Sequence, residues 1–336
     1  MPKAFICGCA GLELNAEEKG FLRASDPWGL ILFRRNVASR DQLRQLTESF
    51  RDCVGRAGAP VLVDQEGGRV QRMGPPHWPA YPPLGALEGK LTPPRAESAA
   101  RLVARLIAHD LTEAGISVDC APVIDVVEPA SHAFIVARAA SSHPERVIAM
   151  CRAFAEGLLA GGVAPVIKHM PGHGRARADS HFELPRVDAP REALKRDFAP
   201  FAALTDLPMA MSAHVVFSVI DPDRPATTSS KVVKEIMRGE IGFDGLIMSD
   251  DISMKALGGS CEERAKAIIA AGLDIVLHCN GELDEARAVA SATPELSGES
   301  LRRAEAALAA IRPPAPFDLD KAAAEFAEIT SALEPA

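Results

Sequence analysis

Short apolar runs alternate with longer, more polar segments along almost the whole chain. Eight of the runs are bounded by turn residues and are short enough to be buried strands. They cover Phe5–Cys9, Gly29–Phe33, Pro60–Val63, Ser117–Ile124, Val163–Ile167, Pro208–Val216, Leu246–Ser249 and Asp274–Leu277.

The segments between these runs have the spacing of amphipathic helices. After Ser39, apolar residues recur at Leu43, Leu46 and Phe50, the pattern of one buried helix face. Asn15 stands before AEEKGFLRA, where it can cap a helix. The helices predicted by such signals are Asn15 to Ala24, one beginning at Ser39, Pro94 to Gly115, Glu145–Leu159, Arg191–Leu204, Lys231–Arg238 and Cys261–Ala271.

Eight buried strands alternating with helices predict an α/β fold with a parallel sheet, because crossover helices cover such sheets. The number eight favours closure into a (β/α)8 TIM barrel. The first strand is followed by CAGLE, without the GxGxxG of a dinucleotide site. We expect residues 1–336 to form a single catalytic barrel domain, with residues 281–336 as a C-terminal helical cover packed on it.

Composition excludes several classes of partner. Hydrophobic residues make up 47% of the chain, enough for a large core, and the net charge is −8 without any run of five Lys or Arg. These values favour a small-molecule substrate over nucleic acid. No window approaches the ~20 apolar residues of a membrane span. The N-terminus lacks the apolar region of a secretory signal, and seven scattered cysteines suggest reduced thiols. We therefore expect a cytoplasmic monomer.

Polar residues gather directly after the predicted strands, where barrel enzymes place their sites. The third strand runs into DQEGGRVQR, whose glycines allow close approach of a ligand and whose Asp64, Arg69 and Arg72 offer charged hydrogen-bonding groups. A tight turn with solvated charges is an equally good interpretation of this segment alone.

The fifth strand runs into KHMPGHGRARADSH, residues 168–181, which permits two hypotheses. His169, His173 and His181 with Asp179 could bind zinc or iron, although the intervening Pro and Gly break any HExxH-like helix. Alternatively, Asp179 and His181, two residues apart, point the same way in an extended segment. A carboxylate orients an imidazole and favours its protonated form, which suits acid/base catalysis.

The seventh strand ends in Asp250 and Asp251. A carboxylate at this position can be a nucleophile, or it can cap the following turn, for which Asp251 is well placed. Spacing alone does not decide between the two aspartates. Asp125 and Arg138 follow the fourth strand and, taken alone, are ordinary loop residues.

Together these segments resemble the bacterial β-N-acetylglucosaminidases (β-hexosaminidases) of glycoside hydrolase family 3. The resemblance covers nearly the whole chain and rests on ordered motifs. These are ELNAEEKGFL, WGLILFRRNV, DQEGGRVQR, APVIDV, IKHMPGHG, DSH, MSAHVV, FDGLIMSDDISM and GLDIVLHCN.

The resemblance implies a retaining double displacement without metal or cofactor. Asp250 corresponds to the nucleophile, and His181 with its partner Asp179 corresponds to the acid/base. The resemblance also implies a set of residues that bind the sugar, namely Asp64, Arg72, Arg138, Lys168 and His169.

The chain departs from the family pattern in three places. Arg138 stands in RAASSHP, without the aromatic and acidic residues usual after it, and Met170 replaces a phenylalanine. Arg175 and Arg177 add positive charge before DSH, where they would either favour an anionic product or be solvated.

The compact form resembles the cytoplasmic enzymes that trim imported peptidoglycan fragments in cell-wall recycling. The expected reaction is hydrolysis of terminal β-linked N-acetylglucosamine from GlcNAc-1,6-anhydroMurNAc(-peptide) muropeptides. The alternatives are a phosphorylase or β-glucosidase of the same fold, a metal-dependent barrel hydrolase, and a non-catalytic sugar-binding protein.

Overall fold

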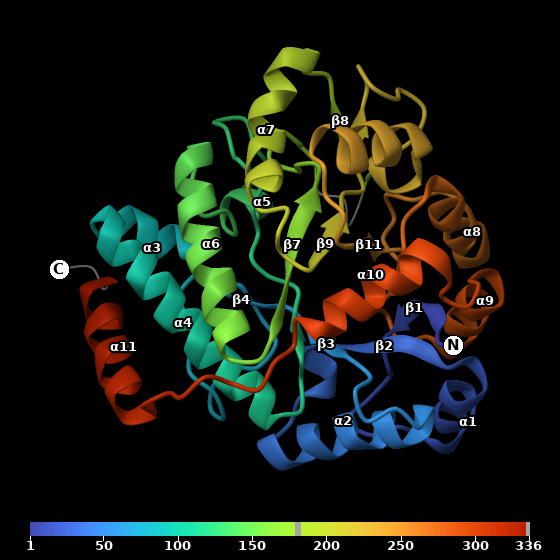
Figure 1. The fold of residues 1–336 in the computed structure, drawn as a ribbon, viewed down its shortest axis with the longest axis horizontal. Coiled ribbons are helices and arrows are strands. Elements are labelled where there is room, and N and C mark those ends of the chain that lie inside the picture. Colours follow the sequence, from blue (N-terminus) through green and yellow to red (C-terminus); the bar gives the residue numbers. More distant parts are fainter. Residues whose placement is uncertain (179–182, 334–336) are drawn as a thin grey trace.

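A closed barrel of eight parallel strands forms the centre of the molecule (Figure 1). The computed structural model describes residues 1–178 and 183–333. The strands lie in the order β1-β12-β11-β9-β7-β6-β3-β2, which confirms the predicted (β/α)8 barrel. Their bounds are Lys3–Cys7 (β1), Pro27–Leu32 (β2), Val61–Val63 (β3), Val118–Asp119 (β6), Ala164–Met170 (β7), Met209–Ser212 (β9), Leu246–Asp251 (β11) and Ile275–His278 (β12).

Helices surround the barrel, and two of them begin at the caps that the sequence predicts. The Asn15 side chain accepts a hydrogen bond from the Glu18 N–H, and Ser39 accepts one from the Gln42 N–H. The helices are α1 (Ala16–Ser25), α2 (Arg40–Val54), α3 (Leu84–Lys90), α4 (Pro93–Glu113), α5 (Ala133–Val136), α6 (Pro144–Ala160), α7 (Arg191–Ala203), α8 (Cys261–Ala271), α9 (Leu283–Ala292), α10 (Gly298–Ala309) and α11 (Leu319–Leu333).

The side chains of each barrel strand alternate between two apolar layers. In β1, Ala4 and Ile6 belong to the cluster inside the barrel, whereas Phe5 and Cys7 belong to the cluster between strands and helices. This alternation follows from the two-residue period of a strand. Both faces of the sheet are therefore apolar, as expected of parallel strands covered by helices.

Two predicted strands are shorter than expected. The run 117–124 is a regular strand only over β6, since Pro122 lacks the N–H that a ladder requires. The run 208–216 ends as a strand at Ser212, where Ser212 and His214 turn to hydrogen-bond the Thr227 hydroxyl. Its last residue starts β10 (Val216–Phe217), which pairs with β8 (Arg186–Val187) outside the barrel.

Two further short strands and three short helical segments lie outside the barrel. The segment predicted as a helix over 231–238 is π-helical over Val232–Glu240 (η3). The other segments are the antiparallel pair β4 (Gln65–Gly67) and β5 (Val70–Gln71), and the 3-10 turns η1 (Arg34–Asn36) and η2 (Ala226–Thr228).

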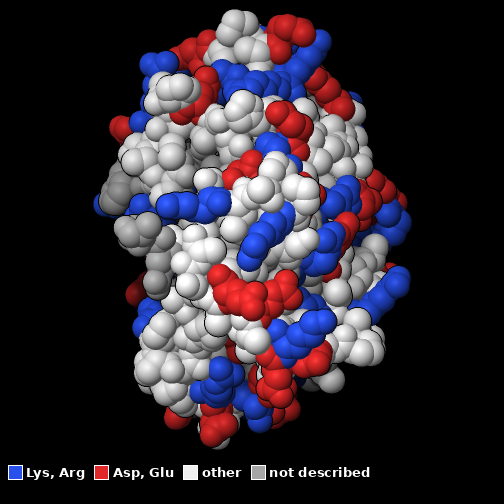
Figure 2. Space-filling model, turned by 90° about the vertical axis from the view of Figure 1, so that its left-hand side faces the viewer, with Lys and Arg blue, Asp and Glu red and all other residues white. Residues whose placement is uncertain are grey.

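The C-terminal helices occupy three different places. Helix α9 packs beside α8 and β1, and α11 packs against α3 and α4. Ala304 and Ala307 of α10 belong to the interior cluster, so α10 closes the end of the barrel where the strands begin. None of the described helices combines the length and apolarity needed to cross a bilayer. Figure 2 shows acidic and basic side chains intermixed over one face of the molecule.

Candidate active site

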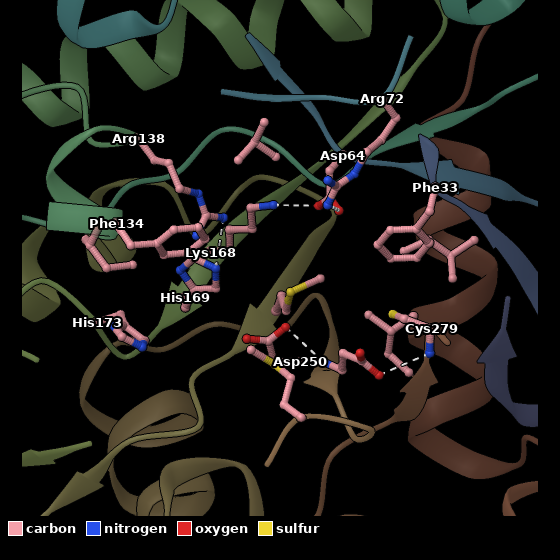
Figure 3. Close-up of a pocket in the computed structure, with 17 residues that line it drawn as sticks. Phe33, Asp64, Arg72, Phe134, Arg138, Lys168, His169, His173, Asp250 and Cys279 are labelled. Atoms are coloured by element: carbon pink, nitrogen blue, oxygen red, sulfur yellow. Dashed lines mark hydrogen bonds and ion pairs between the residues drawn. The ribbon is translucent and has the colours of Figure 1, made fainter. Parts of the chain in front are cut away.

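The interior of the barrel changes from apolar to polar in one layer near the carboxyl ends of the strands. Interior residues of three strands are followed, two positions later, by charged residues that line a single pocket (Figure 3). The successions are Leu62 to Asp64, Val166 to Lys168 and Met248 to Asp250. Because parallel strands end at the same edge, these side chains converge.

The pocket is open to solvent and has both polar and apolar walls. The space within the pocket and its open mouth together is about 640 Å³. The apolar part is formed by Phe33, Phe134, Met211, Met254 and Leu277. The pocket is therefore suited to a ligand with polar edges and apolar faces.

Asp64 lies between two cations at the floor of the pocket. Its Oδ1 accepts a hydrogen bond from Lys168 Nζ at 2.8 Å, and its Oδ2 accepts one from Arg72 at 2.8 Å. Burial opposes ionisation, but Lys168 and Arg72 outweigh it and hold the pKa of Asp64 below its usual range. The Arg72 side chain keeps one buried nitrogen, Nε, without a partner among the described residues.

Glu66 extends this network to Arg138. Lys168 Nζ lies 2.6 Å from Glu66 Oε1, and Arg138 donates two hydrogen bonds to the Glu66 carboxylate at 2.7 and 2.9 Å. Burial works against the charge of Lys168, but the carboxylates of Asp64 and Glu66 raise its pKa. Lys168 and Arg138 are thus held charged and immobile, since each is buried against paired carboxylates.

Asp125 holds His169 in a fixed orientation. Its Oδ2 lies 2.7 Å from His169 Nδ1, and its Oδ1 accepts hydrogen bonds from the backbone N–H groups of His169 and His173. Burial opposes the charge on Asp125, yet these contacts lower its pKa below the ordinary value. An ionised carboxylate only accepts, so Nδ1 of His169 bears the proton. His169 Nε2 lies 3.4 Å from Arg138 Nη2.

His173 also lines the pocket, next to His169 and facing the Asp250 carboxylate (Figure 3). It is 2% exposed, and neither ring nitrogen has a hydrogen-bond partner among the described residues. Burial lowers its pKa to about 4, so the ring is neutral at physiological pH. A buried imidazole without partners inside a pocket is available to a ligand.

The structure separates the roles of the two adjacent aspartates. Asp251 is saturated, because Ser253 donates to both of its carboxylate oxygens and the Cys279 N–H donates to Oδ1. Among the described residues, Asp250 accepts one hydrogen bond, from the Asp251 N–H at 2.8 Å. Burial opposes its ionisation, but His214, His169 and this N–H hold its pKa below the usual value. Asp250 is therefore an ionised carboxylate with spare acceptor capacity, and Asp251 secures the turn.

A family model for the glycosyl hydrolase family 3 N-terminal domain matches residues 7–309 of the chain. The chain belongs to glycoside hydrolase family 3. A β-hexosaminidase from Alkalilimnicola ehrlichii is 40% identical over 282 residues, covering 82% of this chain and 80% of the relative. Another from Idiomarina loihiensis is 38% identical over 88% of this chain and 89% of its own.

Solved structures of family 3 enzymes have the same fold. NagZ from Neisseria gonorrhoeae in complex with N-trifluoroacetyl-D-glucosamine superposes with a TM-score of 0.83 at 31% identity, covering 99% of this chain and 96% of its own. A β-N-acetylglucosaminidase from Paenibacillus gives a TM-score of 0.86 at 26% identity, with 98% and 67% covered. The family resemblance and the enzyme class predicted from the sequence, a β-N-acetylhexosaminidase, are confirmed.

The structure brings most of the predicted family 3 residues into one pocket. Asp250 lines this pocket together with all five residues expected to bind sugar, namely Asp64, Arg72, Arg138, Lys168 and His169. The predicted acid/base pair, Asp179 and His181, lies outside the described residues. His169 and His173 belong to no group of three potential metal ligands in the described part of the chain.

The sequence did not indicate the roles of three residues in or beside the pocket, namely Glu66, Asp125 and His173. Glu66 and Asp125 secure Arg138 and His169 from segments distant in sequence, a pairing that only the closed barrel produces. His173 was considered only as a metal ligand. Of the two arginines before DSH, Arg175 is neither solvated nor free for a product, because it pairs with Glu128 at 2.5 Å and with Asp197. Arg177 is exposed.

Proposed function

We propose that this enzyme hydrolyses terminal, non-reducing β-linked N-acetylglucosamine with retention of configuration, using Asp250 as the nucleophile. The observation that supports this proposal best is the state of Asp250, which lines the pocket, is ionised, and has acceptor capacity that residues 1–178 and 183–333 do not fill. A carboxylate of this kind can attack an anomeric carbon and form a covalent glycosyl-enzyme.

The charged floor of the pocket is suited to sugar hydroxyls. Asp64 and Arg72 present hydrogen-bonding groups with fixed geometry, and Lys168 is held between two carboxylates. His169 also lines the pocket, where Asp125 holds its ring in a fixed orientation. Phe33 and Met254 supply apolar surface for the carbon faces of the ring. That the Neisseria relative was solved with N-trifluoroacetyl-D-glucosamine agrees with such a ligand.

His181, with Asp179 as its partner, completes the mechanism that we propose. Asp250 attacks the anomeric carbon while His181 gives its proton to the departing glycosidic oxygen, which breaks the glycosidic bond. His181 then takes a proton from water, the water oxygen attacks the anomeric carbon, and Asp250 leaves as a carboxylate. The support for this pair is the DSH motif in a family 3 chain.

We further propose that the natural substrates are GlcNAc-1,6-anhydroMurNAc muropeptides in cell-wall recycling. Support comes from the match to NagZ over nearly the full length of both chains. The seven free cysteines, six of them buried, fit a reducing compartment such as the cytoplasm. Incubation with purified disaccharide and disaccharide-peptide, with analysis of products by mass spectrometry, tests this substrate directly.

The mechanism is tested on an aryl β-N-acetylglucosaminide with and without EDTA. Wild type should release the aryl alcohol in both conditions, and Asp250→Ala should lose at least about 10³-fold in kcat. A 5-fluoro glycosyl fluoride of N-acetylglucosamine should label the peptide that contains Asp250. His143→Ala, an exposed histidine, is the control and should keep full activity.

The acid/base assignment has its own test. His181→Ala should lose activity most on substrates with poor leaving groups, and azide should restore turnover and give a β-glycosyl azide. Activity that disappears with EDTA while Asp250→Ala stays active would instead favour a metal-dependent hydrolase. Rates that require phosphate would identify a phosphorylase, and preference for a glucoside would identify a β-glucosidase. Sugar binding without turnover, unaffected by either substitution, would indicate a binding protein.

A further inference from the structure

A cysteine, a histidine and a glutamate converge on the outside of the barrel, behind the pocket wall. Cys261 is the first residue of α8, His278 ends β12, and Glu285 lies in the first turn of α9. Their ligand atoms all lie within 4.8 Å of one another, and no other such group occurs within residues 1–178 and 183–333. None of the three lines the active-site pocket.

We propose that Cys261, His278 and Glu285 form a binding site for Zn²⁺, separate from the reaction centre. Cys261 Sγ lies 3.4 Å from Glu285 Oε2, and His278 Nε2 lies 3.2 Å from the same oxygen. In tetrahedral zinc sites, bond lengths of ~2.0–2.3 Å place neighbouring ligand atoms about 3.3–3.6 Å apart. The two separations are close to that spacing without any rearrangement of the backbone.

The strand period explains why His278 is available for this site. Leu277 and Cys279 line the pocket, and His278 is directed to the opposite face, toward α8 and α9. His278 is fully buried, and its Nδ1 has no partner among the described residues. The imidazole can therefore carry its proton on Nδ1, which leaves the Nε2 lone pair for a metal in place of the contact with Glu285.

The charges and surroundings fit a divalent cation. A thiolate and a carboxylate neutralise Zn²⁺, with imidazole as the neutral third ligand. Burial and the neighbouring Glu285 carboxylate raise the pKa of the Cys261 thiol to about 11, so Zn²⁺ would displace its proton on binding. Asn280 donates a hydrogen bond to Glu285 Oε2 at 2.6 Å, the outer contact typical of a ligating carboxylate. Glu285 is 45% exposed, so the ion has an entry path and a fourth position for water.

Such an ion would add a direct link between three elements that otherwise meet only through packing and hydrogen bonds. Helix α8 follows the loop 252–260, which contains the pocket residue Met254, and the ion would tie the start of this helix to β12 and α9. We therefore expect Zn²⁺ to stabilise the part of the barrel that follows the nucleophile strand, without entering the reaction.

The test uses Co²⁺ as a spectroscopic substitute for Zn²⁺ on the reduced, full-length protein. Wild type should bind one Co²⁺ that shows tetrahedral absorption and a thiolate-to-cobalt charge-transfer band, and one Zn²⁺ should displace it. Cys261→Ser should abolish the charge-transfer band, and Glu285→Gln should weaken Zn²⁺ binding at least about 10-fold. Cys53→Ser, a cysteine that belongs to no such cluster, is the matched control and should keep the band.

Thermal unfolding provides a second measurement. Zn²⁺ should raise the Tm of wild type and of Cys53→Ser but not that of Cys261→Ser, because a ligand stabilises only the state that binds it. Hydrolysis of the aryl substrate by Cys261→Ser should equal that of wild type. Absence of the charge-transfer band in wild type, or its persistence in Cys261→Ser, would show that the three residues form only a hydrogen-bonded cluster.

Discussion

The two ends of the barrel both contain buried charges, but they use them differently. At the end where strands begin, Asp274 is fully partnered, because Oδ2 accepts from Arg238 and the Ile247 N–H and Oδ1 accepts from Ser300 and Arg303. At the opposite end, the pocket holds polar atoms without partners among the described residues, on His173 and Arg72, and Asp250 with spare acceptor capacity. Saturation thus distinguishes a structural cluster from a binding site.

The physical reason is the cost of unsatisfied polar groups. A buried polar atom without a partner destabilises the fold by about 1–3 kcal/mol, so several such atoms gathered in one pocket indicate a place where a ligand would complete them. Substitutions at the pocket end should therefore lower activity more than stability. Substitutions at the opposite end should lower stability more than activity.

The largest expected effect is on activity, at Asp250. Asp250→Asn should lower kcat at least about 10³-fold. It should leave the Tm equal to or above that of wild type, because it removes a desolvated charge that accepts one hydrogen bond from the described residues. Asp251→Asn should lower the Tm instead, since both of its carboxylate oxygens are partnered. Kinetics and thermal unfolding of both variants measure this contrast, and equal losses of Tm would break the comparison.

The next effect is on stability, at the opposite end. Asp274→Ala should lower the free energy of unfolding by about 3–5 kcal/mol, because it leaves two partly buried arginines, Arg238 and Arg303, without their shared carboxylate. The kcat of the folded fraction should stay near that of wild type. Urea unfolding and assays at low temperature measure both quantities; a loss below about 1 kcal/mol would contradict the structural role of this cluster.

The pH dependence of stability sharpens the comparison at His173. Its pKa is about 4 in the folded state, below its ordinary value of 6.5, so only the unfolded state binds this proton as the pH falls between those values. The contribution is fully present above pH 6.5 and is lost toward pH 4, by about 3 kcal/mol. His173→Gln should remove this part of the slope in urea unfolding between pH 7 and 4. An unchanged slope would mean that the ring is not neutral and buried in solution.

The smallest effect is expected at an exposed ion pair on the solvent side of the Asp274 cluster. Arg302 donates to both oxygens of Asp244 at 2.8 Å, but the side chains are 47% and 68% exposed. Arg302→Ala should therefore change the free energy of unfolding by less than about 1 kcal/mol, and salt should reduce the difference further. A loss comparable to that of Asp274→Ala in urea unfolding would show that burial does not set the ranking.

The sequence by itself determined the barrel and most of the pocket. Eight short apolar runs separated by helical segments predict a parallel sheet covered on both faces, and the family resemblance of the motifs after the strands points to Asp64, Lys168 and Asp250. Once Leu246 and Met248 are known to face the interior, the two-residue period of a strand also distinguishes Asp250 from Asp251, because Asp250 continues that interior series.

Only the tertiary structure decided which distant residues became partners. Three pairings join different βα units, and no local pattern predicts them: Glu66 with Arg138, Asp125 with His169, and Cys261 with the neighbouring residues His278 and Glu285. The early end of the sixth strand likewise depends on Thr227, fifteen residues beyond Ser212. Periodicity reports which face of a strand or helix is buried, whereas side-chain pairing depends on how those faces are brought together when the barrel closes.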